Sequence, residues 1–75
     1  MDELLEFMAK SLVSNPDAVK VTKKITSSEL TLELSVAPED MGKVIGKRGR
    51  IAKALRLIVS AAALDTDKRV NVDII

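Results

Sequence analysis

The sequence predicts an α+β fold in which three helices cover one face of a three-stranded sheet, in the order helix, strand, strand, helix, helix, strand. Two kinds of pattern lead to this prediction: apolar residues recur at helical spacing in three segments, and they alternate with polar residues in three others. The 75 residues suit one domain, which we assign to residues 1–75. The hydrophobic fraction of 47% is sufficient for a core, and without cysteine or histidine that core must supply the stability.

The first helix is predicted over residues 3–14. Its apolar stripe comprises Leu4, Leu5, Phe7, Met8, Leu12 and Val13. We assign Phe7 and Met8 of this stripe to the core. The helix should end before Pro16, because a residue that precedes proline avoids the helical region of backbone space.

Two alternating segments follow, at residues 19–26 and 29–36. In the second segment the inward positions are Leu30, Leu32, Leu34 and Val36. In the first segment Val19, Val21 and Ile25 share one side with Lys23, which suggests that this side is partly open. The short connection Ser27-Ser28 predicts a hairpin, so that the two strands are antiparallel neighbours. Lysine and glutamate on the polar faces are then placed to pair across the strands.

A second helix is predicted to start at Pro38, because proline and two acids suit a first helical turn. Its short buried face comprises Met41, Val44 and Ile45. Helical spacing resumes after Gly49, with the inward stripe Ile51, Leu55, Ile58, Val59 and Ala62 and a second apolar edge that includes Leu57 and Ala61. A polar connection at 65–68 leads to a last strand over 69–75, whose inward residues are Val70, Val72 and Ile74.

Between the last two helices lies the loop Gly46-Lys47-Arg48-Gly49. Glycine allows a tight turn and leaves the backbone bare, and a helix that follows offers unpaired N–H groups and a partial positive charge to an anion. The net charge is only +1, but no acid lies between Asp40 and Asp65, where the chain carries Lys43, Lys47, Arg48, Arg50, Lys53 and Arg56. We therefore expect this loop to hold a polyanion such as a nucleic-acid backbone.

Several other functions are disfavoured. A chain without histidine or cysteine shows no pairing of a nucleophile with a base, so we predict that the protein is not an enzyme. The loop does not match the phosphate-binding loop of nucleotide hydrolases, because Arg48 stands where a hydroxyl residue is needed. With Phe7 as the one aromatic residue, no platform for base stacking is available. We expect no cofactor, metal, small-molecule substrate or membrane partner, and a cytoplasmic protein.

The segment Val44-Ile45-Gly46-Lys47-Arg48-Gly49-Arg50-Ile51 resembles the signature of K-homology (KH) domains, in which a hydrophobic residue, Ile and Gly-x-x-Gly precede a helix. The predicted element order is similar to the type II KH arrangement, and the whole chain resembles the small stand-alone bacterial KH proteins of the KhpA family. This resemblance implies a non-catalytic protein that binds single-stranded RNA and acts as an RNA chaperone or post-transcriptional regulator. It also implies a homodimer, a heterodimer with a larger RNA-binding protein of the KhpB type, or both.

The resemblance assigns roles to individual residues. Gly46 and Gly49 would let the RNA backbone approach, while Lys47 and Arg48 would supply charge. The basic rim would be extended by Lys43, Arg50 and Lys53. The bases would meet an aliphatic groove formed by Ile45 and Ile51, with part of Leu34 or Val36. The expected dimer interface is the spare apolar edge Leu57, Ile58 and Ala61. Core packing is the competing explanation for these apolar residues, and a plain surface position is the competing one for Arg56.

Two further functions stay open at this stage. A helix, a glycine turn and a second helix also occur in helix-turn-helix proteins that bind duplex DNA, although the helix after Arg50 offers few polar residues to read bases. The apolar residues Leu57, Ile58 and Ala61 are equally compatible with a dimerising protein-interaction adaptor.

Overall fold

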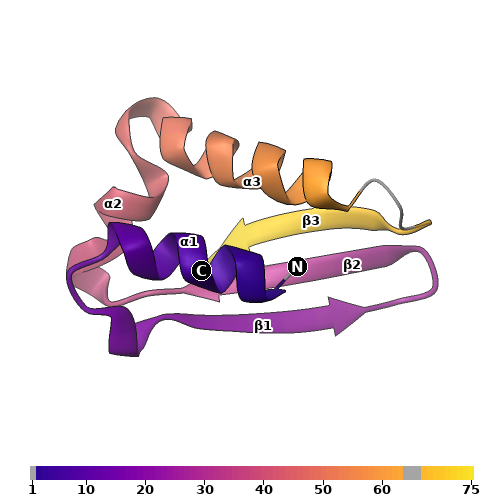
Figure 1. The fold of residues 1–75 in the computed structure, drawn as a ribbon, viewed down its shortest axis with the longest axis horizontal. Helices are drawn as coiled ribbons and strands as arrows, with labels where there is room; N and C mark the ends of the chain where they lie inside the picture. The colour runs from indigo at the N-terminus through magenta and orange to yellow at the C-terminus, as the bar shows by residue number, and fades with distance from the viewer. Residues whose placement is uncertain (1, 64–66) are drawn as a thin grey trace.

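The computed structural model describes residues 2–63 and 67–75 and shows the predicted order of elements (Figure 1). The helices and strands are α1 (Asp2–Leu12), β1 (Lys20–Ile25), β2 (Glu29–Ser35), α2 (Met41–Ile45), α3 (Arg50–Ala62) and β3 (Arg69–Ile74). Short 3₁₀ turns occupy Pro16–Ala18, Pro38–Asp40 and Lys47–Gly49. Residues 65 and 66 of the polar connection that we predicted at 65–68 lie outside the described residues.

The sheet has the strand order β1-β2-β3, so β2 is central. As predicted, β1 and β2 are antiparallel, with Ile25 opposite Leu30, while β3 runs parallel to β2, with Val72 opposite Leu32. Parallel neighbours need a crossover connection, and the segment that contains α2 and α3 supplies it. Consequently all three helices lie on one face of the sheet (Figure 1), and the fold is a two-layer α+β domain.

The core lies between the central strand and the helices. Its buried residues are Leu5, Ala9, Val19, Leu30, Leu32, Leu34, Val36, Val44, Leu55, Val59 and Val72. The predicted inward residues of β2 are therefore all in the core. The side of β1 that carries Lys23 is partly open, as predicted, and the ion pair between Lys24 Nζ and Glu33 Oε2 at 3.2 Å confirms pairing across the strands.

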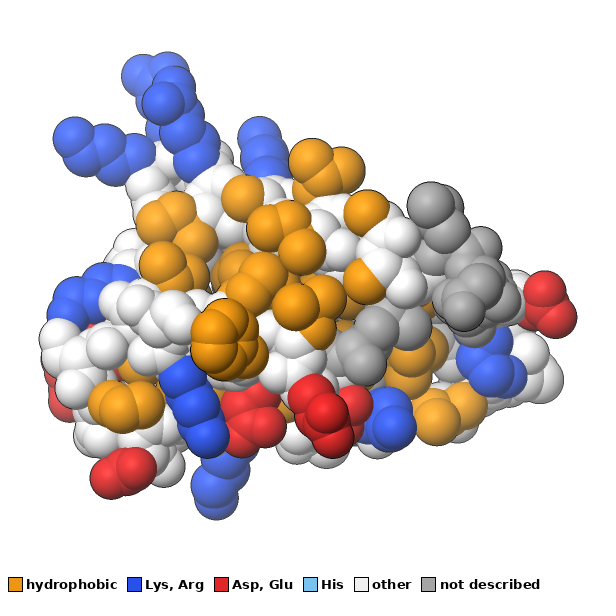
Figure 2. Space-filling view, in the orientation of Figure 1, with side chains coloured by type: hydrophobic (Ala, Val, Ile, Leu, Met, Phe, Trp, Pro, Cys, Tyr) orange, Lys and Arg blue, Asp and Glu red, His pale blue; other side chains and the backbone are white. Residues whose placement is uncertain are grey.

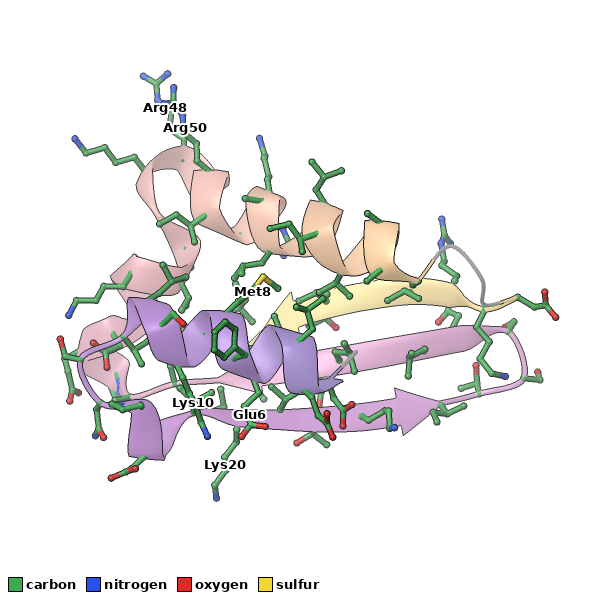
Figure 3. The ribbon with its side chains drawn as sticks, viewed as in Figure 1. Glu6, Met8, Lys10, Lys20, Arg48 and Arg50 are labelled. Atoms are coloured by element: carbon green, nitrogen blue, oxygen red, sulfur yellow. The ribbon has the colours of Figure 1, made fainter. Side chains whose placement is uncertain are left out.

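The prediction that Phe7 belongs to the core is wrong. Helix α1 buries Leu5 and Ala9, which are one turn apart, while Met8 packs against the core from beside them. Figure 3 shows Met8 between α1 and α3. Phe7 lies on the flank of this narrow stripe and is 70% exposed. Because α1 packs against the rest of the protein along a narrow stripe, some residues of its apolar pattern remain exposed.

The same limit applies to two residues that we placed on the inward stripe of α3. Ile58 is 45% exposed and Ala62 is also exposed, because the buried stripe of α3 runs through Ala52, Leu55 and Val59 instead. Ile25, on the partly open side of β1, is 59% exposed, although its partner Leu30 on the central strand is buried. These three residues add apolar surface that the fold does not cover.

Candidate nucleic-acid interface

The loop between α2 and α3 is built on left-handed backbone angles. Gly46 and Gly49 both have φ 73°, and Arg48 has φ 57°. The Gly46 N–H donates to the Gly42 carbonyl at 2.9 Å, and the Gly49 N–H donates to the Gly46 carbonyl at 3.3 Å. Arg48 is the one non-glycine residue with positive φ in the described part of the chain. Such strained positions cluster at functional sites, and here the strained residue lies at the tip of the loop.

The two glycines are needed for different reasons. A Cβ atom on Gly46 would lie 2.7 Å from Cγ1 of Ile51, so Gly46 allows the first turn of α3 to pack against the loop. A Cβ atom on Gly49 would meet nothing within 4 Å. The backbone at Gly49 is therefore bare and faces open space, which allows a ligand to approach it closely.

Four basic side chains surround this bare backbone: Lys47, Arg48, Arg50 and Lys53. All four are exposed, and none forms an ion pair or hydrogen bond with another described residue. The Lys and Arg side chains at the loop project from one end of the molecule (Figure 2), where Arg48 and Arg50 point away from the body (Figure 3). The start of α3 lies at the same place without a side-chain cap, and it adds partial positive charge.

Two other basic residues of this segment are held by the protein itself. Lys43 Nζ lies 3.3 Å from Oδ1 of Asp40 and also donates to the Ser14 hydroxyl. The Arg56 side chain donates through Nε to the Val72 carbonyl at 3.0 Å. The structure therefore divides the basic segment into four side chains at the loop that have no partner among the described residues and two that hold other elements of the fold.

Asp40 is fully buried and was not recognised from the sequence, where it is one of two acids at a helix start. Its carboxylate accepts the Ser14 N–H at 3.1 Å through Oδ1 and the Asn15 N–H at 3.0 Å through Oδ2. The Ser14 hydrogen bond, followed by that of Asn15 and by Lys43, lowers the pKa of Asp40 below 3.8 despite burial. The carboxylate is therefore ionised at neutral pH and accepts two backbone hydrogen bonds from the turn after α1.

The expected aliphatic groove is only partly present. Ile45 is 38% exposed beside the loop, and Ile51 is half-buried beneath Gly46. Leu34 is fully buried and Val36 is 8% exposed, so the expectation that these two residues line the groove is wrong. They face the core because β2 is the central strand, which the helices cover.

Two hollows of different character flank α3. A polar hollow of about 490 Å³ follows β3 and is lined by Glu29, Thr31, Arg56, Ser60, Val70, Asn71, Val72 and Asp73. An apolar groove of about 450 Å³ separates α3 from α1 and is lined by Phe7, Met8, Ser11, Leu12, Arg50, Ile51, Ala54, Leu55 and Ile58. The first hollow offers hydrogen-bonding groups, whereas the second offers mainly aliphatic and aromatic surface.

The three residues of the expected dimer interface lie on the outer side of α3. Leu57 is 71% exposed, Ile58 is 45% exposed, and Ala61 is also exposed. With Phe7 they form what we call the α1–α3 apolar face, and Figure 2 shows apolar side chains gathered over these helices. Monomer core packing therefore does not account for them.

Comparison with known proteins gives a consistent result. The model of the family described as KhpA/KhpB, KH domain matches residues 2–74. The chain belongs to this family of KH domains. The observed order of elements is that of a type II KH fold.

Relatives in several bacteria match along the whole length of this KH domain. The RNA-binding protein KhpA of Clostridium acetobutylicum and that of Caldanaerobacter subterraneus subsp. tengcongensis are each 59% identical over 75 residues, with 100% of both chains covered. The protein of the same name from Halalkalibacterium halodurans is 53% identical, with 100% of this chain and 99% of the relative covered. No solved structure gave a significant match.

Within residues 2–63 and 67–75, no group of three or more acidic, histidine or cysteine side chains is placed to hold a metal ion. No helix in this part of the chain has the length and apolar character needed to cross a bilayer.

Proposed function

We propose that this protein binds single-stranded RNA without catalysis and grips the RNA backbone with the loop Gly46–Gly49. One observation carries the proposal: four exposed cations without a partner among the described residues lie at and just after a bare glycine backbone that faces open space. The name of the relatives, RNA-binding protein KhpA, agrees with this assignment. Membership of a KH family disfavours the helix-turn-helix alternative.

In this mechanism the RNA phosphates lie against the loop. The open space at Gly49 lets a phosphate reach the backbone, while Lys47 and Arg48 neutralise charge independently of the base sequence. Arg50 and Lys53 follow on the first turn of α3 and extend the basic track. We do not include Lys43 among the primary phosphate contacts, because its ammonium group is engaged by Asp40 and Ser14.

The bases would extend from the loop toward β3. Ile45 offers aliphatic surface beside the loop, whereas Ile51 lines the apolar groove on the α1 side of α3. The polar hollow offers the Asn71 amide and the hydroxyls of Thr31 and Ser60. Groups of this kind form hydrogen bonds with base edges, which an apolar groove does not. We therefore assign the polar side of α3 to RNA and the apolar side to a protein partner.

The partner that we propose is a second copy of this chain. On the α1–α3 apolar face, Phe7 and Ile58 line an apolar groove and Leu57 is exposed on the outer side of α3, which suits a self-complementary contact. The family description also names KhpB, and a KH domain of that type is the alternative occupant of the same face. Since one KH module holds about four nucleotides, pairing of modules would raise the avidity for RNA.

These properties suit a cytoplasmic RNA chaperone or post-transcriptional regulator, which must contact many RNAs through their backbone. The proposal is tested by fluorescence anisotropy with a short labelled single-stranded RNA, titrated against unlabelled RNA and duplex DNA. We expect RNA to compete more strongly, and the logarithm of the affinity to fall with the logarithm of the salt concentration by about 0.7 per neutralised phosphate. Stronger competition by duplex DNA would favour the helix-turn-helix alternative instead.

A further inference from the structure

We infer that Asp40 is a positioning residue for the RNA-binding loop, because it ties the start of α2 to the turn that follows α1. The inference rests on the proposed function for its consequence, but the positioning itself is a property of the unbound protein. It also reassigns Lys43, which becomes part of this tie instead of a contact to RNA.

The first step of the argument is the weakness of α2 on its own. This helix has only five residues, Met41–Ile45, and one of them is Gly42. A helix of this length does not form in water without tertiary support. Its one fully buried side chain is Val44, with Met41 partly buried against the core. We call α2 the stalk, because it carries Gly46 at its end. The stalk therefore depends on contacts with the rest of the protein.

The second step is that Asp40 supplies such a contact at the start of the stalk. Each carboxylate oxygen accepts one backbone N–H, from Ser14 and Asn15, which lie 26 and 25 residues away in sequence. Both N–H groups belong to the turn between α1 and β1. The carboxylate thus joins the turn after α1 to the start of α2.

The third step concerns the charge of this buried carboxylate. Lys43 is one turn further along α2, and its ammonium group lies 3.3 Å from Oδ1 of Asp40 while donating to the Ser14 hydroxyl. A buried carboxylate needs both a counter-charge and hydrogen bonds to remain favourable. Lys43 therefore strengthens the link between α2 and the turn after α1, and its charge is already neutralised within the protein.

The Gly46 amide provides a direct readout. It donates to the Gly42 carbonyl at 2.9 Å, which is the last hydrogen bond of α2, so its hydrogen exchange reports opening of the stalk. In Asp40→Asn one oxygen is replaced by an NH₂ group that faces a backbone donor, and the ion pair with Lys43 is lost. We expect the protection of the Gly46 amide to fall at least tenfold, and RNA affinity to fall with it.

A matched variant separates positioning from general destabilisation. Leu30→Ala removes core packing on the central strand, away from α2, and is expected to lower the thermal midpoint while leaving the protection of the Gly46 amide within about twofold, because opening of the stalk is local. The inference is wrong if Asp40→Asn leaves the Gly46 amide as protected as in the wild type. It is equally wrong if Leu30→Ala lowers that protection to the same extent.

The reassignment of Lys43 is tested separately by the salt dependence of RNA binding. Lys47→Met should reduce the slope by about 0.7, whereas Lys43→Met should leave it unchanged. Equal reductions would mean that Lys43 contacts phosphate and would overturn the reassignment. If the wild type binds no RNA, the proposed function fails, but the hydrogen-exchange comparison still decides whether Asp40 positions the loop.

Discussion

Cγ1 of Ile51 lies 2.7 Å from the position that a Cβ atom on Gly46 would occupy. Ile51 therefore packs closely beside Gly46. This brings the two ends of the loop together, because Gly46 follows α2 and Ile51 lies in the first turn of α3. The loop is therefore packed on its inner side, at Gly46, and open on its outer side, at Gly49.

This asymmetry predicts different effects for two alanine substitutions. Gly46→Ala should destabilise the protein by about 2–4 kcal/mol, since it combines a left-handed backbone angle with a clash against Ile51. Gly49→Ala should cost only about 1–2 kcal/mol, for the backbone angle alone, yet weaken RNA binding because its methyl group enters the open space. Urea denaturation and fluorescence anisotropy measure the two effects.

Gly42→Ala is the matched control for these variants. Gly42 lies within α2 at an ordinary helical angle, and a Cβ atom there would meet nothing within 4 Å. The substitution should stabilise the protein by about 0.5–1 kcal/mol. Equal losses of stability in Gly46→Ala and Gly49→Ala would contradict the packing that we describe for Ile51.

Self-association should depend on the α1–α3 apolar face. Replacing both Leu57 and Ile58 with aspartate is expected to shift a dimer to monomer in sedimentation velocity, because two desolvated charges would be placed in the contact. Ile25→Asp is the control, since Ile25 is 59% exposed on β1, outside this face. A wild-type protein that sediments as a strict monomer at micromolar concentration would argue against the second copy as partner.

The free energy of unfolding should decrease at acidic pH as Asp40 loses its charge. The Ser14 hydrogen bond, with those of Asn15 and Lys43, lowers the pKa of Asp40 in the folded protein below 3.8. Its contribution is therefore fully present above this value and is lost as the pH falls through the folded-state pKa. Urea denaturation should show a constant difference between wild type and Asp40→Asn from about pH 5 to pH 8, and a smaller one below about pH 4.

One outcome would contradict this prediction for Asp40. A gap between wild type and Asp40→Asn that stays the same from neutral pH down to about pH 3 would mean that ionisation of Asp40 does not contribute to stability. Asp2 does not disturb the comparison, although the charge of Lys23 lowers its pKa as well, because it is present in both proteins.

Much of the fold was predictable because it follows from local patterns. The alternation in β2 and the proline before α2 each specify an element without reference to the rest of the chain. The loop was also predictable as a tight turn, because two glycines around two basic residues indicate backbone angles that other residues rarely adopt. The parallel pairing of β3 with β2 has no such local signal, because it depends on how the α2–α3 crossover packs on the sheet.

The errors concern how far one element covers another. The apolar pattern of α1 includes Phe7, but only the packing of α1 against the sheet decides that Phe7 is left exposed. We predicted that Leu34 lines the aliphatic groove, but Leu34 is buried because it lies on the central strand. Asp40 could not be recognised, because its partners are backbone N–H groups from residues 25 and 26 positions away.

The most direct test of the central claim is the affinity for single-stranded RNA after charge reversal at the tip of the loop. Lys47 and Arg48 are exposed and form no ion pair or hydrogen bond with another described residue, so replacing both with aspartate should leave the thermal midpoint nearly unchanged. The control replaces Lys10 and Lys20 with aspartate, which changes the net charge equally on the side of the molecule away from the loop (Figure 3). We predict that the loop variant loses RNA binding and that the control keeps most of it. Equal affinities for the two variants would contradict the account.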